Sequence, residues 1–359
     1  MSATSSRINR ILLVRTDRLG DVILTLPLLP VLRKHFPDSH IAMLLRRYTG
    51  EIMEGNPYVD ELIWYDDVDG LIPFGAMRKT LHNKKFDAVI VVYPTLRLAW
   101  LMFRSRIPAR IGTGYRYYSF LFTKRVFEHR KDAKRHELEY NFTLLKELGC
   151  PDNGPPEFYI DIPVEAERNV RQLLESLRID PRKDLIILHP GTGGSAREWS
   201  VENFGRLGTK LIARNDVQVV VSGGRGEGEK VSGVLREMGN KAVGIVDRMN
   251  LKELAALIRL ARLFVSNSTG PLHLAAAVGT PVVGLFPQAS AMSPRRWGPY
   301  TNLKKVIVPP APHDCRKCSG KSEEPCSCMA SITVDEVYEA SQTLLAEGQM
   351  MRKGTLAHG

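Results

Sequence analysis

The chain has 359 residues, of which 43% are hydrophobic and 25% are charged, and its formal net charge is +11 at pH 7. This composition excludes wholesale disorder, and the length favours two domains. Residues 97–135 hold 11 Lys and Arg against 2 acids, which leaves 39 basic and 37 acidic residues elsewhere. One basic segment in a balanced chain indicates a single anionic partner surface, and it argues against nucleic acid as the partner.

The N-terminal half alternates short apolar runs with helix-like stretches, a rhythm typical of βαβ units. We expect strands at residues 11–14, 41–45, 62–65 and 89–92, one helix over 22–36, and another over 137–148 that ends at Gly149. No apolar run approaches the ~18 residues that span a bilayer, and residues 11–14 are too short for the core of a signal peptide. We therefore expect a cytoplasmic protein.

The rhythm restarts after a Pro-rich linker at residues 151–163. Strands are expected at 185–188, 217–221, 263–265 and 282–285, with helices from Ser200, from Glu229, over 251–261 and over 272–278. Two successive halves of this kind predict an α/β protein of two Rossmann-like, doubly wound domains that face each other across a cleft.

The first candidate site follows the first strand, where residues 17–21 read Asp-Arg-Leu-Gly-Asp. Ligands of open α/β sheets collect at this carboxyl edge of the strands. Two interpretations of Asp21 stay open. It either caps the helix by satisfying free backbone N–H groups, which local chemistry favours, or it acts chemically in the cleft.

The second candidate site is the loop from His189 to Ser200. Its small residues, among them Thr192, Gly193 and Ser195, let backbone N–H groups approach a ligand, and Arg197 adds a planar cation suited to phosphate. The loop lacks the Gly-Lys-Ser/Thr ending of a P-loop, so it does not indicate a Mg-dependent ATPase. A solvated loop with Arg197 exposed is the alternative.

Two further stretches in the C-terminal half suggest ligand contacts. Residues 223–229 resemble a dinucleotide fingerprint without its third glycine, and Glu227 there either binds a ribose or opens the next helix. A strand ends in Ser268, Thr269 and Gly270, which create a second anion-accepting helix N-terminus. His273 in the first turn is either a phosphate contact or a structural histidine.

Four of the five cysteines gather near the C-terminus, at Cys315, Cys318, Cys326 and Cys328. They are too few for a disulfide framework in a chain of this length. A structural zinc site with four thiolates, a set of cytosolic thiols and a redox-labile clip remain open. None of these would be catalytic.

Taken together, these loops resemble glycosyltransferase family 9, the bacterial ADP-heptose:lipopolysaccharide heptosyltransferases. The resemblance covers nearly the whole chain. Its carriers are Leu-Gly-Asp at 19–21, the His-Pro-Gly loop ending in Arg197-x-Trp199, the Gly-Gly-x-x-Glu stretch at 223–227, Ser-Thr-Gly-Pro-x-His at 268–273, and Cys-Met-x-x-Ile at 328–332. The sequence departs from the family at two positions, with Arg197 where Lys is usual and Ser268 where Asp is frequent.

The resemblance implies the GT-B fold, with an acceptor domain at 1–165 and a nucleotide-sugar domain at 166–333 that contains the Cys-rich segment 315–328. A helix at 334–346 is expected to pack back on the N-terminal domain, and a flexible tail is expected at 347–359. It also implies that Asp21 is the general base. The donor diphosphate is then held by Arg197, the loop at Gly193 to Ser195, and Thr269 and Gly270, with Glu227 on the ribose.

The implied reaction is inverting, metal-independent transfer of a sugar, expected to be heptose, from ADP-heptose to the lipopolysaccharide core or a related anionic glycolipid. No cofactor is required. The basic segment is then an acceptor or membrane surface at the inner face of the bacterial inner membrane, carried by Arg18, Arg110, Arg116, Lys124 and Arg125 among aromatic residues. A solvated helix face with its aromatics in the core is the alternative.

Three rival functions remain. A nucleotide-sugar epimerase or hydrolase of the same fold would act on the donor without a sugar acceptor. A non-catalytic nucleotide-sugar-binding protein would not need an aspartate in the cleft. An NAD-dependent oxidoreductase would rest on the Gly-rich stretch at 223–229, whose incomplete fingerprint argues against it.

Overall fold

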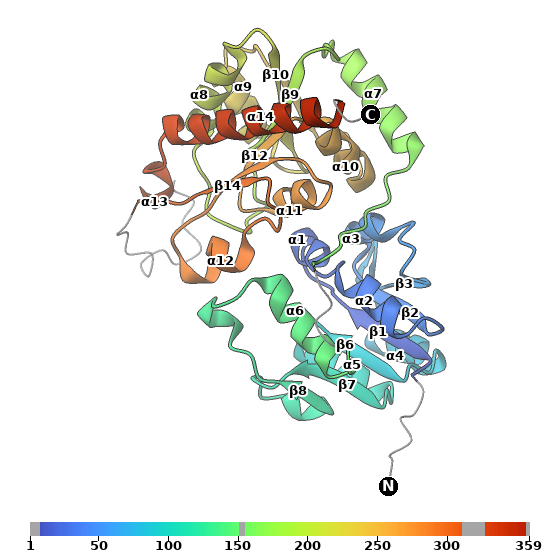
Figure 1. The fold of residues 1–359 in the computed structure, drawn as a ribbon. Helices are drawn as coiled ribbons and strands as arrows, with labels where there is room; N and C mark the ends of the chain where they lie inside the picture. Colours follow the sequence, from blue (N-terminus) through green and yellow to red (C-terminus); the bar gives the residue numbers. More distant parts are fainter. Residues whose placement is uncertain (1–7, 151–154, 311–326, 357–359) are drawn as a thin grey trace. The chain divides into compact units, whose positions relative to one another are not determined.

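The N-terminal half folds around a parallel sheet, as its continuous apolar runs predict. We describe a computed structural model that covers residues 8–150, 155–310 and 327–356 (Figure 1). The strands of this sheet are β1 (Arg10–Val14), β2 (His40–Leu45), β3 (Glu61–Trp64), β6 (Ala88–Val91), β7 (Ala109–Thr113) and β8 (Lys124–Val126). Their order is β3-β2-β1-β6-β7-β8, and all neighbours pair in parallel. A small antiparallel hairpin joins β4 (Asp66–Asp67) to β5 (Gly70–Leu71).

The helices of this half are α1 (Leu19–Ile23), α2 (Leu28–His35), α3 (Arg47–Gly50), α4 (Phe74–Asn83), α5 (Leu96–Arg104) and α6 (Glu137–Lys146), with 3₁₀ turns η1 (Glu51–Met53), η2 (Ser119–Leu121) and η3 (Arg130–Asp132). The prediction of one helix over 22–36 is wrong, because the chain leaves the helix after Ile23 and begins α2 at Leu28. Pro27 is the residue before α2, and proline lacks the N–H that a continuing helix would need.

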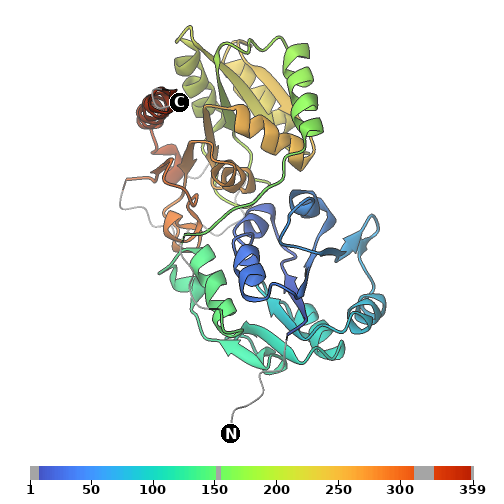
Figure 2. The ribbon, with the colours of Figure 1, turned by 45° about the vertical axis from the view of Figure 1, so that its right-hand side comes forward.

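The C-terminal half repeats the same plan with a second parallel sheet. Its strands are β9 (Asp184–His189), β10 (Val217–Gly223), β11 (Val243–Val246), β12 (Leu263–Asn267), β13 (Val282–Leu285) and β14 (Lys304–Ile307), in the order β11-β10-β9-β12-β13-β14. The main helices are α7 (Val164–Ser176), α8 (Val201–Ile212), α9 (Gly228–Glu237), α10 (Leu251–Leu260) and α11 (Gly270–Ala277). Helices α8 and α9 pack together on one face of this sheet, and α7 and α10 on the other (Figure 2).

Shorter elements complete the C-terminal half: η4 (Ser290–Met292), α12 (Pro294–Trp297) and α13 (Ser327–Ala330), followed by the long helix α14 (Val334–Leu356). The sequence predicted that residues 334–346 pack on the N-terminal domain, and the structure shows what this helix contributes to the C-terminal unit. Val337, Leu344 and Leu345 of α14 belong to the apolar core of the C-terminal half, where the helix lies along α8 and β14. The helix also continues to Leu356, through most of the predicted tail at 347–359.

The chain divides into two compact units, residues 1–161 and 162–359, whereas the sequence predicted the boundary at 165. Each unit has a doubly wound parallel sheet and a core of its own, so the predicted α/β class with two Rossmann-like domains is confirmed. In each sheet the strand order reverses beside the first strand, between β1 and β6 and between β9 and β12. Loops after the strands at such a point form the usual ligand site of an open sheet.

Candidate active site

Asp21 lies in α1, directly after the first strand of the N-terminal unit. The residue before this helix is Arg18, whose side chain makes no capping hydrogen bond. The Asp21 carboxylate instead accepts a hydrogen bond from the guanidinium of Arg15, which follows β1 and is only 1% exposed. The environment of Asp21 is therefore an ion pair with a buried arginine, not a helix cap.

Arg15 is the centre of a small charged network. Its Nε donates to Asp17 Oδ1 at 2.7 Å, and its Nη1 lies 3.9 Å from Glu137 Oε1. Glu137, on α6, is itself buried and accepts a hydrogen bond from Arg130. A buried arginine needs such partners, because an unpaired charge away from water is costly. The sequence predicted Asp21 from its motif but gave no signal for Arg15 or Glu137.

This network sets the proton affinity of Asp21. Burial raises the pKa of Asp21 to about 6, and the neighbouring Arg15 guanidinium opposes that rise. The pKa of Arg15 is raised above its ordinary value, because its carboxylate neighbours outweigh the effect of burial. A carboxylate with a pKa of about 6 is mostly ionised at neutral pH, yet it is a stronger base than an exposed aspartate.

In the C-terminal unit, the loop after β9 turns sharply over small residues. Gly193 and Gly194 adopt positive φ angles of +53° and +72°, which glycine takes without strain. Thr192 Oγ1 accepts a hydrogen bond from the Gly194 N–H at 3.2 Å and donates to Glu198 Oε1 at 2.8 Å. Ser195 Oγ donates to the Thr192 carbonyl oxygen at 2.7 Å. These bonds hold the predicted donor residues in one defined turn, with Arg197 half-buried beyond it.

Glu227 joins this loop to the Gly-rich turn that follows β10. Its Oε1 accepts from the Gly193 N–H at 3.1 Å, and its Oε2 accepts from the Gly224 N–H at 2.8 Å. A Cβ atom on Gly191 would lie 2.0 Å from Glu227 Oε1, so a larger residue there would force the Glu227 carboxylate to move. His189, at the end of β9, donates or accepts at Ser222 Oγ over 2.9 Å, and burial lowers its pKa.

The third part of the candidate site lies at the end of β12. Asn267 is fully buried, accepts from the Trp199 N–H at 2.9 Å and donates to the Pro190 carbonyl oxygen at 2.8 Å. Its amide therefore fixes both ends of the loop after β9 against β12. Ser195 Oγ also lies 3.4 Å from the Ser268 carbonyl oxygen, as a weak donor to it.

Helix α11 begins directly after these residues. Thr269 precedes it in an extended conformation and makes no capping bond with its side chain, and Gly270 is the first helical residue. Thr269 and His273 are both buried, at 6% exposure each. The structure thus gathers Thr192, Gly193, Ser195, Arg197, Glu227, Ser268, Thr269, Gly270 and His273 at one end of the C-terminal sheet, where β9, β10 and β12 end.

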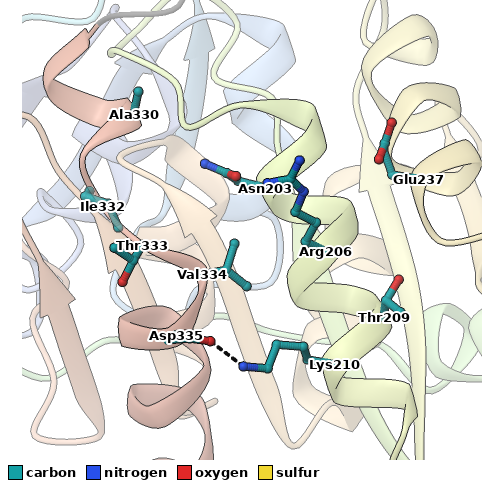
Figure 3. A pocket seen from close by; sticks show the side chains of 10 residues that line it. All are labelled: Asn203, Arg206, Thr209, Lys210, Glu237, Ala330, Ile332, Thr333, Val334 and Asp335. Atoms are coloured by element: carbon teal, nitrogen blue, oxygen red, sulfur yellow. Dashed lines mark hydrogen bonds and ion pairs between the residues drawn. The ribbon is translucent and has the colours of Figure 1, made fainter.

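Trp199, in the loop after β9, is part of the apolar core of the C-terminal unit. It is 1% exposed, stacks edge-on against Phe204 with ring centroids 5.0 Å apart, and donates from Nε1 to the Ile332 carbonyl oxygen at 2.9 Å. Ile332 also lines a cavity of about 620 Å³ between α8 and the start of α14 (Figure 3). None of the predicted donor residues lines this cavity.

The predicted surface residues differ in their surroundings. Arg18, Arg116, Lys124 and Arg125 are exposed, and Lys124 donates to the Glu147 carbonyl oxygen. Arg110 is half-buried and donates to backbone carbonyl oxygens, with Nε 2.7 Å from Leu121 O. It therefore holds a loop in place as well as carrying charge.

The metal prediction rests mostly on residues that are not described. Cys315, Cys318 and Cys326 lie outside the described residues, and Cys328 is buried in the core of the C-terminal unit. Among the residues that the structure describes, no group of three His, Cys, Asp or Glu could hold a metal ion. Within the same residues, no helix is long and apolar enough to cross a membrane.

Two doubly wound parallel-sheet units, each with loops at the reversal of its strand order, have the architecture of the GT-B fold. The family model for glycosyltransferase family 9 (heptosyltransferase) matches residues 74–326, and the chain belongs to this family. A "putative glycosyltransferase" of Haemophilus influenzae is 30% identical over 310 residues, which cover 84% of this chain and 90% of that protein. The lipopolysaccharide core heptosyltransferase OpsX of the same organism is 25% identical over 82% of this chain and 83% of its own length.

Solved structures agree with this assignment. A glycosyl transferase family 9 protein from Veillonella parvula has a TM-score of 0.81 at 26% identity, covering 96% of this chain and 100% of its own. E. coli ADP-heptose lps heptosyltransferase II shares the fold, with a TM-score of 0.76 at 20% identity over 95% of this chain and 99% of its own. The chain is therefore an enzyme that transfers a sugar.

Proposed function

We propose that the protein transfers heptose from ADP-heptose to a hydroxyl group of the lipopolysaccharide core or a related anionic glycolipid, with inversion at the anomeric carbon and without a metal. The observation that carries this proposal is the buried pair of Asp21 and Arg15, in which burial raises the pKa of the carboxyl group to about 6. Such a group can accept a proton during the reaction and remains ionised before it.

In the proposed step, Asp21 takes the proton of the acceptor hydroxyl while the hydroxyl oxygen forms a bond to the anomeric carbon. The bond from that carbon to the diphosphate oxygen breaks, and the nucleoside diphosphate leaves with the electron pair. Attack from the side opposite the leaving group inverts the anomeric centre. Because the base belongs to one unit and the donor loops to the other, the reaction requires both units to act on the same pair of substrates.

The donor half of the proposal rests on the loops after β9 and β12. Arg197 and the positive end of the α11 dipole, where Gly270 is the first helical residue, would neutralise the charge that develops on the leaving diphosphate. Glu227 is held by the Gly193 and Gly224 amides, at 3.1 and 2.8 Å, beside the turn where a nucleotide would lie. A carboxylate in this position would accept hydrogen bonds from the ribose hydroxyls.

The choice of donor and acceptor is supported by the relatives. OpsX is named for transfer to the lipopolysaccharide core, and E. coli heptosyltransferase WaaC, which shares the fold at 18% identity, has been solved with ADP-2-deoxy-2-fluoro heptose. An acceptor of this kind is carried on a membrane lipid, so the proposal places the enzyme at the cytoplasmic face of the bacterial inner membrane.

The test replaces Asp21 by Asn. Transfer from ADP-heptose to a lipopolysaccharide-core acceptor is measured by mass spectrometry of the product, in the presence of EDTA. The Asp21→Asn change is expected to abolish this transfer. The affinity for ADP, measured by calorimetry, is expected to stay within about twofold because the donor loops lie in the other unit. Full transfer by Asp21→Asn would refute the role of the base, and a requirement for added metal would refute metal independence.

Incubation with ADP-heptose alone, without acceptor, distinguishes the rival functions. An epimerase or hydrolase would release an epimer or free heptose without acceptor, and a non-catalytic binding protein would leave ADP-heptose unchanged whether or not acceptor is present. A panel of nucleoside diphosphates scored by thermal shift tests the base of the donor, since a tighter ligand stabilises the folded state more.

A further inference from the structure

Helix α5 of the N-terminal unit is apolar on both of its sides. Its inner face buries Leu98, Leu101 and Met102 against the sheet. Its outer face carries Leu96, Trp100 and Phe103, which are 46%, 41% and 42% exposed. The outer stripe of a surface helix is usually polar, so three exposed apolar side chains on the outer face of α5 are unusual.

A neighbouring segment adds two more exposed aromatic side chains, Tyr117 at 79% and Phe120 at 68% exposure. Arg110 links this segment to α5, because its guanidinium lies 5.5 Å from the centroid of the Phe103 ring and its Nε donates to the Leu121 carbonyl oxygen. The Tyr118 hydroxyl donates to the Pro94 carbonyl oxygen at 2.8 Å, just before α5. We call Leu96, Trp100, Phe103, Tyr117 and Phe120 the aromatic face.

The charge around the aromatic face has one sign. Residues 97–127 contain no Asp or Glu and seven Lys or Arg: Arg97, Arg104, Arg106, Arg110, Arg116, Lys124 and Arg125. Arg104, Arg106 and Arg116 are exposed, and the Arg104 guanidinium lies 5.7 Å from the centroid of the Trp100 ring. A face of exposed aromatic rings with a basic rim fits a partner that is apolar within and negatively charged at its surface.

We propose that the aromatic face docks this protein on the surface of a bilayer that contains anionic phospholipids. Trp, Tyr and Phe side chains enter the boundary between headgroups and acyl chains, and basic side chains beside them bind the lipid phosphates. A second copy of the chain fits less well, because two copies meeting at this face would bring like charges together. The proposal deepens the proposed function, on which it rests for a lipid-borne acceptor.

The test measures binding of the full chain to vesicles by flotation, without donor or acceptor, so its outcome does not depend on transfer. Vesicles of phosphatidylcholine alone are compared with an equal mixture of phosphatidylcholine and phosphatidylglycerol. Binding is expected only with the mixture and is expected to weaken as salt is added. A double change, Trp100→Ser with Phe120→Ser, is expected to reduce binding about tenfold or more.

A second variant tests the basic rim. Changing Arg104, Arg106 and Arg116 to Gln is expected to lower binding about fivefold for each charge removed, or about a hundredfold in total. Two controls match these changes: Val68→Ser removes a 96% exposed apolar side chain from the β4–β5 hairpin, and Arg206→Gln with Arg236→Gln removes exposed charges from the C-terminal unit. Both controls are expected to bind as the unaltered protein does.

Several outcomes would overturn the proposal. These are equal binding to both kinds of vesicle, unchanged binding by the Trp100→Ser and Phe120→Ser variant, or equal losses in the controls. Sedimentation velocity without lipid tests a further outcome. If the unaltered protein is a dimer and the Trp100→Ser and Phe120→Ser variant is a monomer, the aromatic face binds a second copy of the chain and the proposal is overturned. Unchanged melting temperatures establish that the variants fold, and unchanged ADP affinity separates lipid binding from the donor site.

Discussion

Replacing Asp21 by Asn is expected to stabilise the N-terminal unit at neutral pH while it removes activity. Burial raises the pKa of Asp21 from 3.8 to about 6 in the folded protein, with Arg15 opposing the rise. The folded protein therefore binds this proton more tightly than the unfolded chain does. The stability that the protonated group contributes is fully present below pH 3.8 and is lost as the pH rises to about 6.

The size of this effect follows from the two pKa values. At ~1.4 kcal/mol for each tenfold change in proton affinity, the difference between 3.8 and about 6 corresponds to about 3 kcal/mol. The Asn side chain cannot ionise, but its amide oxygen can still accept a hydrogen bond from Arg15. Arg15 also keeps Asp17 as a partner at 2.7 Å. The variant is therefore expected to gain stability over the unaltered protein, by up to about 3 kcal/mol, as the pH rises from about 4 to about 6.5.

Hydrogen exchange measured by mass spectrometry suits this question, because it reports the opening free energy of buried strands in one unit at a time. Peptides covering β1 and β6 are compared at several pH values in both proteins. Asp69→Asn removes an exposed carboxylate from the β4–β5 hairpin and serves as the control for the change in net charge. A difference in opening free energy that is the same at pH 4 and pH 6.5 would refute the reasoning, as would a variant that is less stable at every pH.

Three further outcomes are expected, one in the N-terminal unit and two in the C-terminal unit. Glu137→Gln removes a charge that raises the pKa of Asp21. In a plot of transfer rate against pH, the midpoint of the acid limb is therefore expected to fall below about 6. Gly191→Ala places a Cβ 2.0 Å from the carboxylate of Glu227 and is expected to weaken ADP binding about tenfold, measured by calorimetry. Gly228→Ala is the control, because its Cβ would lie 3.9 Å from its nearest neighbour, and it is expected to leave ADP affinity unchanged. Trp199→Ala is expected to lower the unfolding free energy of the C-terminal unit by about 3–5 kcal/mol, measured by chemical denaturation. The change removes a large side chain that is 1% exposed and leaves a cavity in the core.

The strands of both sheets could be predicted where the sequence contains a continuous apolar run, as at residues 11–14 and 185–188. Parallel strands are buried on both faces, so their residues are apolar without alternation. Strand β8 (Lys124–Val126) was not predicted, because an edge strand with two exposed basic residues resembles a loop. The contribution of α14 to the C-terminal core was not predicted, because the apolar residues of this helix do not reveal which of two cores they join.

The candidate site residues also divide into those that local sequence predicts and those that it does not. Asp21 and the glycine-rich loops after β9 and β10 follow strands at the sheet edge where ligands of open sheets collect, so the local order of the sequence predicted where they lie in the fold. Arg15 was not found, because an arginine after a strand ordinarily begins a solvated loop. Only the folded chain brings Glu137 of a distant helix towards it, at 3.9 Å. The amide of Asn267, which holds the loop after β9 at both ends, likewise had no signal beyond the motif beside it.

The hydrogen bond from Trp199 to the carbonyl of Ile332 joins residues 133 positions apart in the sequence. A ribosome produces the N-terminal unit, with Asp21 and Arg15, long before it produces Ile332. Units of a chain fold as they emerge, and contacts between distant residues form late. The loop after β9 is therefore among the last parts of the protein to mature. In a nascent chain that stops before Ile332, Asp21 and Arg15 are expected to be in place while the loop after β9 lacks the hydrogen bond to Ile332.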